Sequence, residues 1–415
     1  MCRHISRYTV LSVLLVMTGL LVSCGPEHED EDEHILPSDI HRAVVVYMVA
    51  ENNLSRQSAA DMREMLDAIP RLPADALTLV YIDDLDAPRL YALSPLLPVD
   101  ESLGGRIRQL KTYMEEVSSA SGERLHEVLA DVDAIPQLAG VEKGLVLWSH
   151  GTGWQADGKA TEVRLRSAFG MDNGHNTFRN TGDMMSVRDM NDALSAFPSF
   201  RFIFFDACLM QTVETVFELR HRAAVIAGSP AEIPREGCPY GAVLPQLLSD
   251  VIDWQQVLDT YNEAYEQHGM GDGVVLSAVR TDALDRLFAA TQSMLSAYGA
   301  YVPFVDLSVV NNYFIYDEWK TMTDAAHPIP DGYDMDGFMY EFLPERDYQS
   351  WKTSLDAVLL ASARPRSWWS AYPEAAIETK DTPLCGMSMY LPIDKYANTP
   401  FPAAYEQMQW SGVWK

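Results

Sequence analysis

Five predominantly apolar runs, rich in β-branched and aromatic residues, set the strongest limit on how this chain folds. They comprise residues 43–49, 76–82, 144–148, 200–205 and 223–227. Continuous apolar runs of this length are typical of strands buried on both faces. Stretches expected to be helical separate them, namely 58–68, 103–133, 190–197 and the segment after residue 208. Strands alternating with helices predict an α/β fold, with helices on both faces of a mostly parallel sheet.

Two of these strands end in residues that can perform catalysis. Residues 144–148 are followed by Ser149 and His150, and residues 200–205 are followed by Asp206, Ala207 and Cys208. Active sites of parallel sheets lie beyond the carboxyl ends of the strands. A cysteine attacks a carbonyl carbon as a thiolate, and a histidine that is neutral near pH 7 can take the thiol proton and later return it. We therefore predict a Cys208/His150 pair, with Cys208 opening a helix whose N-terminus favours the thiolate.

Gly151 is expected to complete this site. Without a side chain, its backbone N–H can approach a substrate carbonyl, and together with the N–H of Cys208 it would form an oxyanion hole. The alternative is that Cys208 is a buried apolar thiol and His150 an ordinary hydrogen-bonded polar residue. Their placement at the ends of two strands, 58 positions apart, favours the catalytic interpretation.

The N-terminus carries an export signal. Residues 1–8 contain two arginines and residues 9–22 are apolar, which is typical of a secretory signal and short for a membrane span. The sequence Leu-Val-Ser-Cys-Gly at 21–25 resembles the lipobox of bacterial lipoproteins, in which the cysteine is acylated. We expect a signal peptide over 1–23 and a lipid on Cys24; an ordinary signal peptide with an incidental cysteine is the alternative.

An acidic segment follows Cys24. Residues 25–34, GPEHEDEDEH, cannot bury themselves, so 24–40 is expected to be a solvated tether. The tract also resembles acidic surface-export signals of some Gram-negative gut bacteria. This resemblance predicts anchoring to the outer membrane on the cell surface, with the lipid as the protein's contact with the membrane.

The net charge limits the expected binding partners, and the cysteine content limits the expected disulfides and metal sites. The 415 residues carry a net charge of −28, which repels nucleic acid phosphates and suits cationic peptides, although it also simply favours solubility. Of the five cysteines, Cys2 and Cys24 lie in the targeting segment. The remaining three are widely spaced, so they form neither a disulfide framework nor a zinc-binding CxxC pair.

The chain is too long for one ordinary core, so we expect two domains, 41–268 and 269–415. The second is expected to be a smaller α/β domain. Its predicted elements are strands at 274–281 and 386–391 and a helix over 282–299, and its segment 300–372 is rich in aromatic residues.

Four segments of the first domain resemble the clostripain-like cysteine peptidases, which share the caspase-like fold. They are VVVYMVAENNL (44–54), LVLWSHGTGW (145–154), FIFFDACLMQTVETVFEL (202–219) and AGSPAEIPREGCPY (227–240), and GMSMYLP (386–392) is similar to a later strand of the family. Caspases likewise place the histidine about 50 residues before the cysteine. The resemblance implies an endopeptidase that forms an acyl-enzyme, with Cys208 as nucleophile and His150 as general acid and base.

The resemblance also implies cleavage after arginine or lysine, with acidic side chains in the first substrate pocket. Asp206 matches one of these acids; its alternative role is to cap the following helix. Glu236 falls where the family often has an aspartate, or is an ordinary loop acid. Cys238 replaces a usual aromatic residue and is interpreted as a small apolar filler.

Residues 155–185 are expected to be a long functional loop. Relatives are processed by self-cleavage here, and Arg164 and Arg166 are the candidate sites. Asp172, His175 and Asp183 lack the spacing of a metal site, so we expect no metal and no cofactor, while any calcium requirement cannot be read from the sequence. Two alternatives stay open: an inactive caspase-like surface lipoprotein that binds a partner, and an active peptidase with non-basic specificity.

Overall fold

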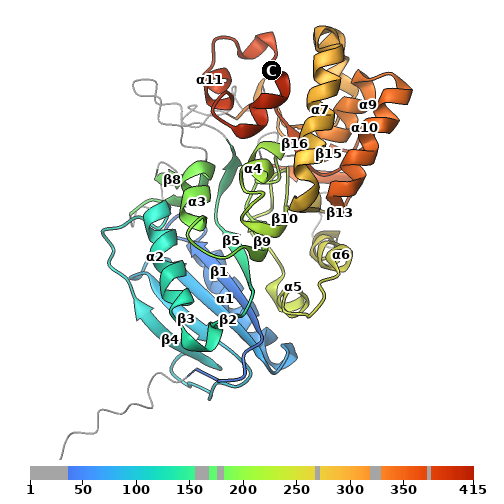
Figure 1. Cartoon of the computed structure of the whole chain (residues 1–415). Helices are drawn as coiled ribbons and strands as arrows, with labels where there is room; N and C mark the ends of the chain where they lie inside the picture. The colour runs from blue at the N-terminus through green and yellow to red at the C-terminus, as the bar shows by residue number, and fades with distance from the viewer. Residues whose placement is uncertain (1–35, 155–167, 175–181, 267–271, 318–328, 372–374) are drawn as a thin grey trace, which may run out of the picture. The chain divides into compact units, whose positions relative to one another are not determined.

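The computed structural model describes residues 36–154, 168–174, 182–266, 272–317, 329–371 and 375–415 (Figure 1). Residues 36–415 form one compact unit. The candidate lipidation site Cys24, the acidic segment after it, and Arg164 and Arg166 lie outside the described residues.

A nine-stranded sheet organises this unit. Its order is β13 (Leu359–Ala363), β11 (Leu276–Arg280), β10 (Ala223–Gly228), β9 (Phe200–Asp206), β5 (Lys143–Trp148), β1 (Arg42–Val49), β2 (Ala76–Asp83), β3 (Arg89–Leu93) and β4 (Ile107–Thr112). The five strands from β10 to β2 are parallel. The two strands at each edge are antiparallel to their neighbours. The predicted α/β fold with a mostly parallel sheet is confirmed, and all five predicted strands form.

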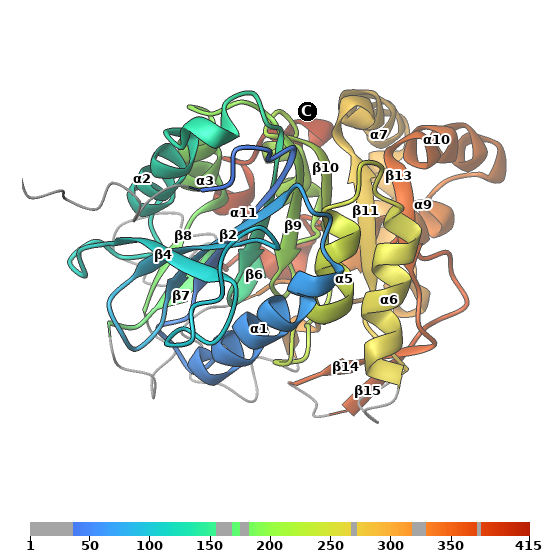
Figure 2. The ribbon, with the colours of Figure 1, turned by 90° about the horizontal axis from the view of Figure 1, so that it is seen from below.

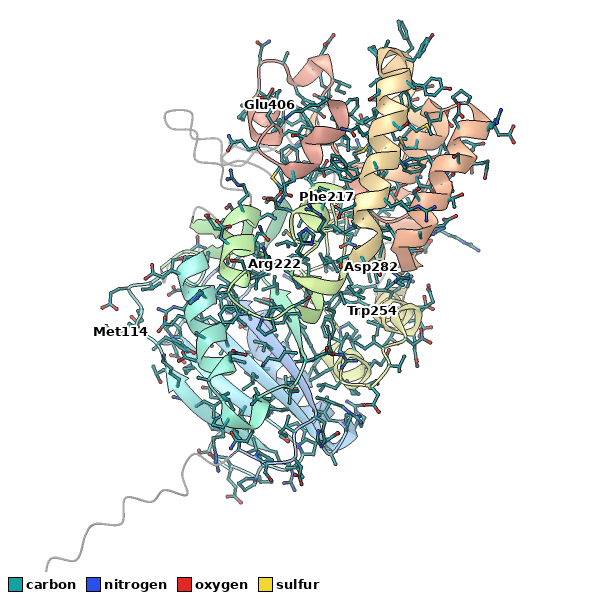
Figure 3. All side chains as sticks on the ribbon, in the orientation of Figure 1. Met114, Phe217, Arg222, Trp254, Asp282 and Glu406 are labelled. Atoms are coloured by element: carbon teal, nitrogen blue, oxygen red, sulfur yellow. The ribbon has the colours of Figure 1, made fainter. Side chains whose placement is uncertain are left out.

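Helices cover both faces of the sheet (Figure 2). One face packs against α1 (Ser55–Ala68), α5 (Tyr240–Leu247) and α6 (Trp254–Glu266). The other packs against α2 (Gly122–Asp133), α3 (Val187–Leu194), α4 (Val213–Glu218), α7 (Leu284–Tyr298), α9 (Met335–Phe342), α10 (Glu345–Val358) and α11 (Phe401–Tyr405). Phe217 of α4 and Trp254 of α6, labelled in Figure 3, belong to these two opposite cores.

The central strands are apolar at most positions because alternate side chains enter opposite cores. In β1, Val45 and Tyr47 pack on one face, whereas Val44 and Val46 pack on the other. Side chains of a strand alternate between its faces, so a strand covered on both sides needs apolar residues at every position. This explains why the five runs were readable as strands from the sequence.

The prediction of a helix over 103–133 is wrong in its first half. Residues Ile107–Thr112 form edge strand β4 and pair with β3. Helix α2 begins only after Ser121, whose side chain accepts a hydrogen bond from the N–H of Arg124. The mixed polar sequence of β4 suits an edge strand with one buried side, and such a pattern is hard to distinguish from a helix.

Two further segments differ from expectation. The predicted loop 155–185 contains strands β7 (Ala168–Asp172) and β8 (Asp183–Met185), which form a small sheet with β6 (Gly151–Gly153). Strands β11 and β13 extend the central sheet beyond residue 268, so the sheet continues across the expected domain boundary. The two-domain division itself stays a prediction.

Two short antiparallel pairs complete the described strands. They are β12 (Tyr333–Asp334) with β16 (Ser388–Met389), and β14 (Ser367–Ser370) with β15 (Ala375–Glu378). Among the residues that the structure describes, no helix has the length and apolar character needed to cross a membrane.

Candidate active site

The central strands bring the predicted pair to one edge of the sheet. Strand β5 lies between β1 and β9, and Trp148 is in register with Met48 of β1 and with Asp206 of β9. His150 and Cys208 therefore each follow a matched position by two residues on neighbouring parallel strands. The sequence predicted this common edge from strand ends alone, because parallel strands align their carboxyl ends.

Gly151 packs directly against the backbone of Cys208. A Cβ atom at Gly151 would lie 2.4 Å from the carbonyl oxygen of Cys208 and 2.9 Å from Cγ of Met210. Real Cβ atoms do not approach a backbone oxygen so closely, so only glycine permits this contact. The segment that carries His150 and the segment that carries Cys208 are thereby in contact at Gly151, whose expected part in an oxyanion hole stays a prediction.

The Cys208 thiol is partly buried and neutral. Its Sγ lies 3.6 Å from the carbonyl oxygen of Ile233, to which it donates, and 3.3 Å from the Ile233 N–H, which donates to it. Burial raises the pKa of Cys208 to about 12, and the negative charge of Glu232 adds to this shift. At neutral pH the resting thiol therefore keeps its proton.

The expectation that Cys208 opens a helix is wrong. Helix α4 begins at Val213, and Thr212 is its N-cap, accepting a hydrogen bond from the N–H of Thr215. Leu209 has φ of 61°, a left-handed conformation that is uncommon for a residue with a Cβ. The chain turns sharply after Cys208 and reaches the helix only later, so the helix dipole does not act on the thiol, and Asp206 is not the helix cap.

His150 has a partner that the sequence did not predict. Its Nε2 lies 2.6 Å from Oδ1 of Asn53, which belongs to the turn after β1. Burial lowers the pKa of His150 to about 4, so its imidazole is neutral at pH 7 and can accept a proton. The one sequence signal for Asn53 was its place in a polar turn, Glu51 to Asn53, that follows a strand at the same edge.

Asp206 is buried below the backbone of the 236–240 segment. Its carboxylate accepts hydrogen bonds from the N–H of Cys238 at 3.1 Å, the hydroxyl of Tyr240 at 3.0 Å and the hydroxyl of Tyr261 at 2.9 Å. Gly237 has φ of +65°, and a Cβ there would lie 3.1 Å from Oδ2 of Asp206. Burial raises the pKa of Asp206, and its three donors are all neutral groups.

Two other acidic residues, Asp61 and Glu236, differ in their burial and in their partners. Asp61 of α1 accepts a hydrogen bond from Nε1 of Trp148 at 2.7 Å, and burial, reinforced by the charge of Asp206, raises the pKa of Asp61 to about 9. Glu236 is half-exposed and pairs with Nε of its neighbour Arg235 at 3.3 Å. The structure thus buries Asp206 among neutral hydrogen-bond donors and leaves Glu236 exposed on the loop that follows β10.

The cysteines of the described part are free thiols. Cys238 is fully buried, and burial raises its pKa well above the usual range, which fits the interpretation of Cys238 as an apolar filler. Cys385 is equally buried, and its N–H donates to Asp334. Cys208 is the one thiol of the described residues that is only partly buried.

The sequence did not predict that three particular acidic side chains would lie together. Carboxylate oxygens of Glu51, Asp83 and Asp172 lie within 4.8 Å of one another. Asp172 accepts hydrogen bonds from the N–H groups of Ser119 and Gly174, and burial raises the pKa of Asp83 to about 7. The expected absence of a metal stays a prediction.

Fold and site together define a cysteine peptidase, with a thiol and an imidazole at the carboxyl edge of a helix-covered parallel sheet. The sequence model of the clostripain family matches residues 46–411, and the chain belongs to that family. The match extends well beyond residue 268 and includes residues 386–392, the one segment after residue 268 in which the sequence showed a resemblance.

Solved structures agree with this assignment. An inactive zymogen C11 protease from Parabacteroides distasonis is 25% identical, with a TM-score of 0.71, over 91% of this chain and 99% of that chain. A secreted C11 cysteine protease from Bacteroides thetaiotaomicron, solved with an irreversible peptide inhibitor, is 24% identical, with a TM-score of 0.72, over 90% and 98% of the two chains. No curated protein matches the chain. The predicted family, fold and enzyme class are confirmed.

Proposed function

We propose that this cysteine peptidase is an endopeptidase that cleaves polypeptides after arginine or lysine, with Cys208 as nucleophile and His150 as general acid and base. The observation that carries the proposal is the contact between the two catalytic segments, where Gly151 packs on the carbonyl of Cys208. That contact and the strand register support a working pair. A second support is the neutral imidazole, which can receive the thiol proton.

The reaction proceeds by acyl transfer. The imidazole of His150 takes the proton of the Cys208 thiol, and the thiolate sulfur attacks the scissile carbonyl carbon. The backbone N–H groups of Gly151 and Cys208 stabilise the oxyanion in this proposal. The carbon–nitrogen bond then breaks, the amine takes the proton from His150, and a water molecule activated by His150 hydrolyses the thioester.

The raised pKa of Cys208 and the lowered pKa of His150 mean that both groups are neutral at rest. Proton transfer between them is therefore unfavourable until a substrate carbonyl and its oxyanion are present. In this proposal, substrate binding also displaces the contacts between the thiol and the backbone of Ile233.

The basic specificity rests on the charge around Asp206. Its carboxylate is buried with neutral donors, and Glu64 adds further negative charge nearby. A guanidinium or ammonium group from the substrate would supply the missing positive charge and offset this repulsion. Glu236, paired with Arg235, contributes at most to the rim of the pocket.

Self-processing in the 155–185 loop, at Arg164 or Arg166, is part of the proposal. Both arginines precede β7 by few residues, and the N–H of Gly170 in β7 donates to the carbonyl of His150 at 3.0 Å. A cut there would free the start of a strand that holds the His150 backbone. The chain with both Arg164→Ala and Arg166→Ala should stay uncut where the parent chain is cut, and the two single variants should show which arginine is used.

We further propose that the enzyme is exported and anchored through a lipid on Cys24 to the outer surface of a Gram-negative outer membrane. The signal-like start, the lipobox resemblance and the acidic residues after Cys24 support this. The similar protease from Bacteroides thetaiotaomicron, solved with a peptide inhibitor, is itself a secreted protein.

The decisive experiment is hydrolysis of a peptide library by the purified chain without its first 35 residues. We expect cleavage after arginine and lysine, and loss of cleavage in Cys208→Ala. Full cleavage by Cys208→Ala would overturn the mechanism. Cleavage after small or acidic residues would remove Asp206 from the pocket and favour a peptidase of different specificity.

A further inference from the structure

Asn53 follows the strand that flanks the His150 strand on the side away from the Cys208 strand. Strand β1 neighbours β5 on one side, and β9 neighbours it on the other. Asn53 follows β1, His150 follows β5 and Cys208 follows β9, so three consecutive strand ends carry the three side chains. The distance from Nε2 of His150 to Oδ1 of Asn53 is 2.6 Å, a short hydrogen bond.

We infer that Asn53 is a positioning residue, which fixes the ring orientation and the tautomer of His150; this inference rests on the proposed function. A side-chain amide oxygen can only accept a hydrogen bond, so Nε2 carries the ring proton. The lone pair of the neutral imidazole is then on Nδ1. Nδ1 is the atom that takes the Cys208 thiol proton and afterwards gives it to the leaving amine.

The turn that carries Asn53 is firmly held by its neighbour. Asn52 is fully buried, and its Nδ2 donates to the carbonyl oxygens of Val49 at 3.0 Å and Met171 at 2.7 Å. Its Oδ1 accepts from the N–H of Leu54 at 2.8 Å. Asn52 therefore fixes the backbone on both sides of Asn53. Because that backbone is already ordered, placing the Asn53 side chain against His150 costs little further conformational entropy.

The same hydrogen-bond system holds the His150 segment. Ser149 donates through Oγ to the Val49 carbonyl at 2.7 Å and accepts from the N–H of Met171 at 3.3 Å. Asn52 and Ser149 thus both bind Val49 and Met171. Since these two shared residues anchor both turns, buried contacts hold the backbone from which the exposed Asn53 side chain reaches His150.

An amide suits this position better than a carboxylate. A neutral acceptor orients the imidazole without stabilising its charged form, so the ring stays an available base at neutral pH. A carboxylate would hold the imidazolium instead. The site uses Asn53 where many histidine-dependent enzymes use an acid, and this choice matches a resting pair in which thiol and imidazole are both neutral.

The test compares Asn53→Ala, Asn53→Asp and Asn398→Ala in the active peptidase, using the best arginyl or lysyl peptide amide. Asn398 is exposed and far along the chain, which makes it a matched control. We expect Asn53→Ala to lower kcat about 10- to 100-fold with KM nearly unchanged, because orientation and proton transfer suffer while substrate contacts remain. Asn53→Asp should restore part of the kcat that Asn53→Ala loses. The apparent pKa of the acidic limb of the kcat/KM profile should rise by about one pH unit.

A second measurement reads the tautomer without any turnover. In Cys208→Ala protein with ring-labelled histidines, the His150 signal, identified by its loss in His150→Ala, should show the proton on Nε2. Asn53→Ala should lose that preference. An unchanged kcat and pH profile in Asn53→Ala, or a proton on Nδ1 in the parent, would overturn the inference. An inactive parent whose His150 still shows the Nε2 tautomer would instead count against the proposed function alone.

Discussion

Gly151 and Cys208 are in backbone contact, with the α-carbon of the glycine against the carbonyl of the cysteine. The clearance is so small that a methyl group at Gly151 would meet the Cys208 carbonyl oxygen at 2.4 Å. This contact joins the two segments that carry the proposed catalytic side chains. A side chain added at Gly151 should therefore affect both the stability and the chemistry of the site.

Gly151→Ala should disrupt the site. The added Cβ forces the two segments apart, which we expect to cost about 1–3 kcal/mol in the free energy of unfolding and most of the activity. Gly299→Ala is the matched control, since Gly299 has φ of −53° and a Cβ there meets nothing within 4 Å. Denaturant unfolding and peptide hydrolysis measure the two effects. Equal stability and activity in both variants would show that the contact is unimportant.

The free enzyme should react slowly with iodoacetamide at neutral pH. Because the pKa of Cys208 is raised to about 12, the thiolate fraction is small at pH 7 and grows as pH rises. The alkylation rate should therefore increase about tenfold per pH unit between pH 7 and pH 9. Mass spectrometry should find the label on Cys208 and not on the buried Cys238 or Cys385. Fast alkylation that is independent of pH would instead indicate a preformed thiolate–imidazolium pair.

Asp206→Asn should change specificity more than it changes folding. The amide keeps the shape of the side chain but removes the negative charge, so kcat/KM for an arginyl substrate should fall on the order of 100-fold. Hydrolysis of a norleucyl substrate should change little. Glu236→Gln serves as the control and should have a small effect, because Glu236 already pairs with Arg235. Parallel losses on both substrates in Asp206→Asn would contradict a pocket role.

Because of the raised pKa of Asp61, the free energy of unfolding should fall as pH rises. Its pKa is raised to about 9 in the folded state, whereas an unfolded aspartate loses its proton near pH 4. Between these values the folded chain binds the extra proton, so the free energy of unfolding falls with increasing pH. In a Cys208→Ala background, Asp61→Asn should therefore gain about 1–3 kcal/mol at pH 8 and nothing near pH 4. A constant difference across this range would exclude the titration of Asp61 as its cause.

Cys24→Ser should abolish lipid attachment. Expressed in a Gram-negative host with an alkyne fatty acid, the parent chain should become labelled and enter the detergent phase. The Cys24→Ser chain should do neither, while Cys2→Ser should behave as the parent. An unlabelled, processed parent would point to an ordinary signal peptide.

The sequence was informative where the information is local. Strands β1, β2, β5, β9 and β10 were predicted because burial on both faces requires unbroken apolar runs. Their parallel arrangement brought His150 and Cys208 to one edge without any knowledge of side-chain contacts. Local pattern failed for β4, since a half-buried edge strand and a helix share a mixed polar composition.

The tertiary structure decided what depends on contacts between distant segments. Asn53 meets His150 across 97 positions, and Asp206 meets Tyr261 across 55, so neither pairing leaves a mark in nearby sequence. The start of α4 at Val213 likewise depends on a left-handed turn at Leu209. The sequence alone predicted the fold class, which the structure confirms, and placed His150 and Cys208 at one edge of the sheet, whereas packing determined the pKa shifts of these two residues and the residues that contact them.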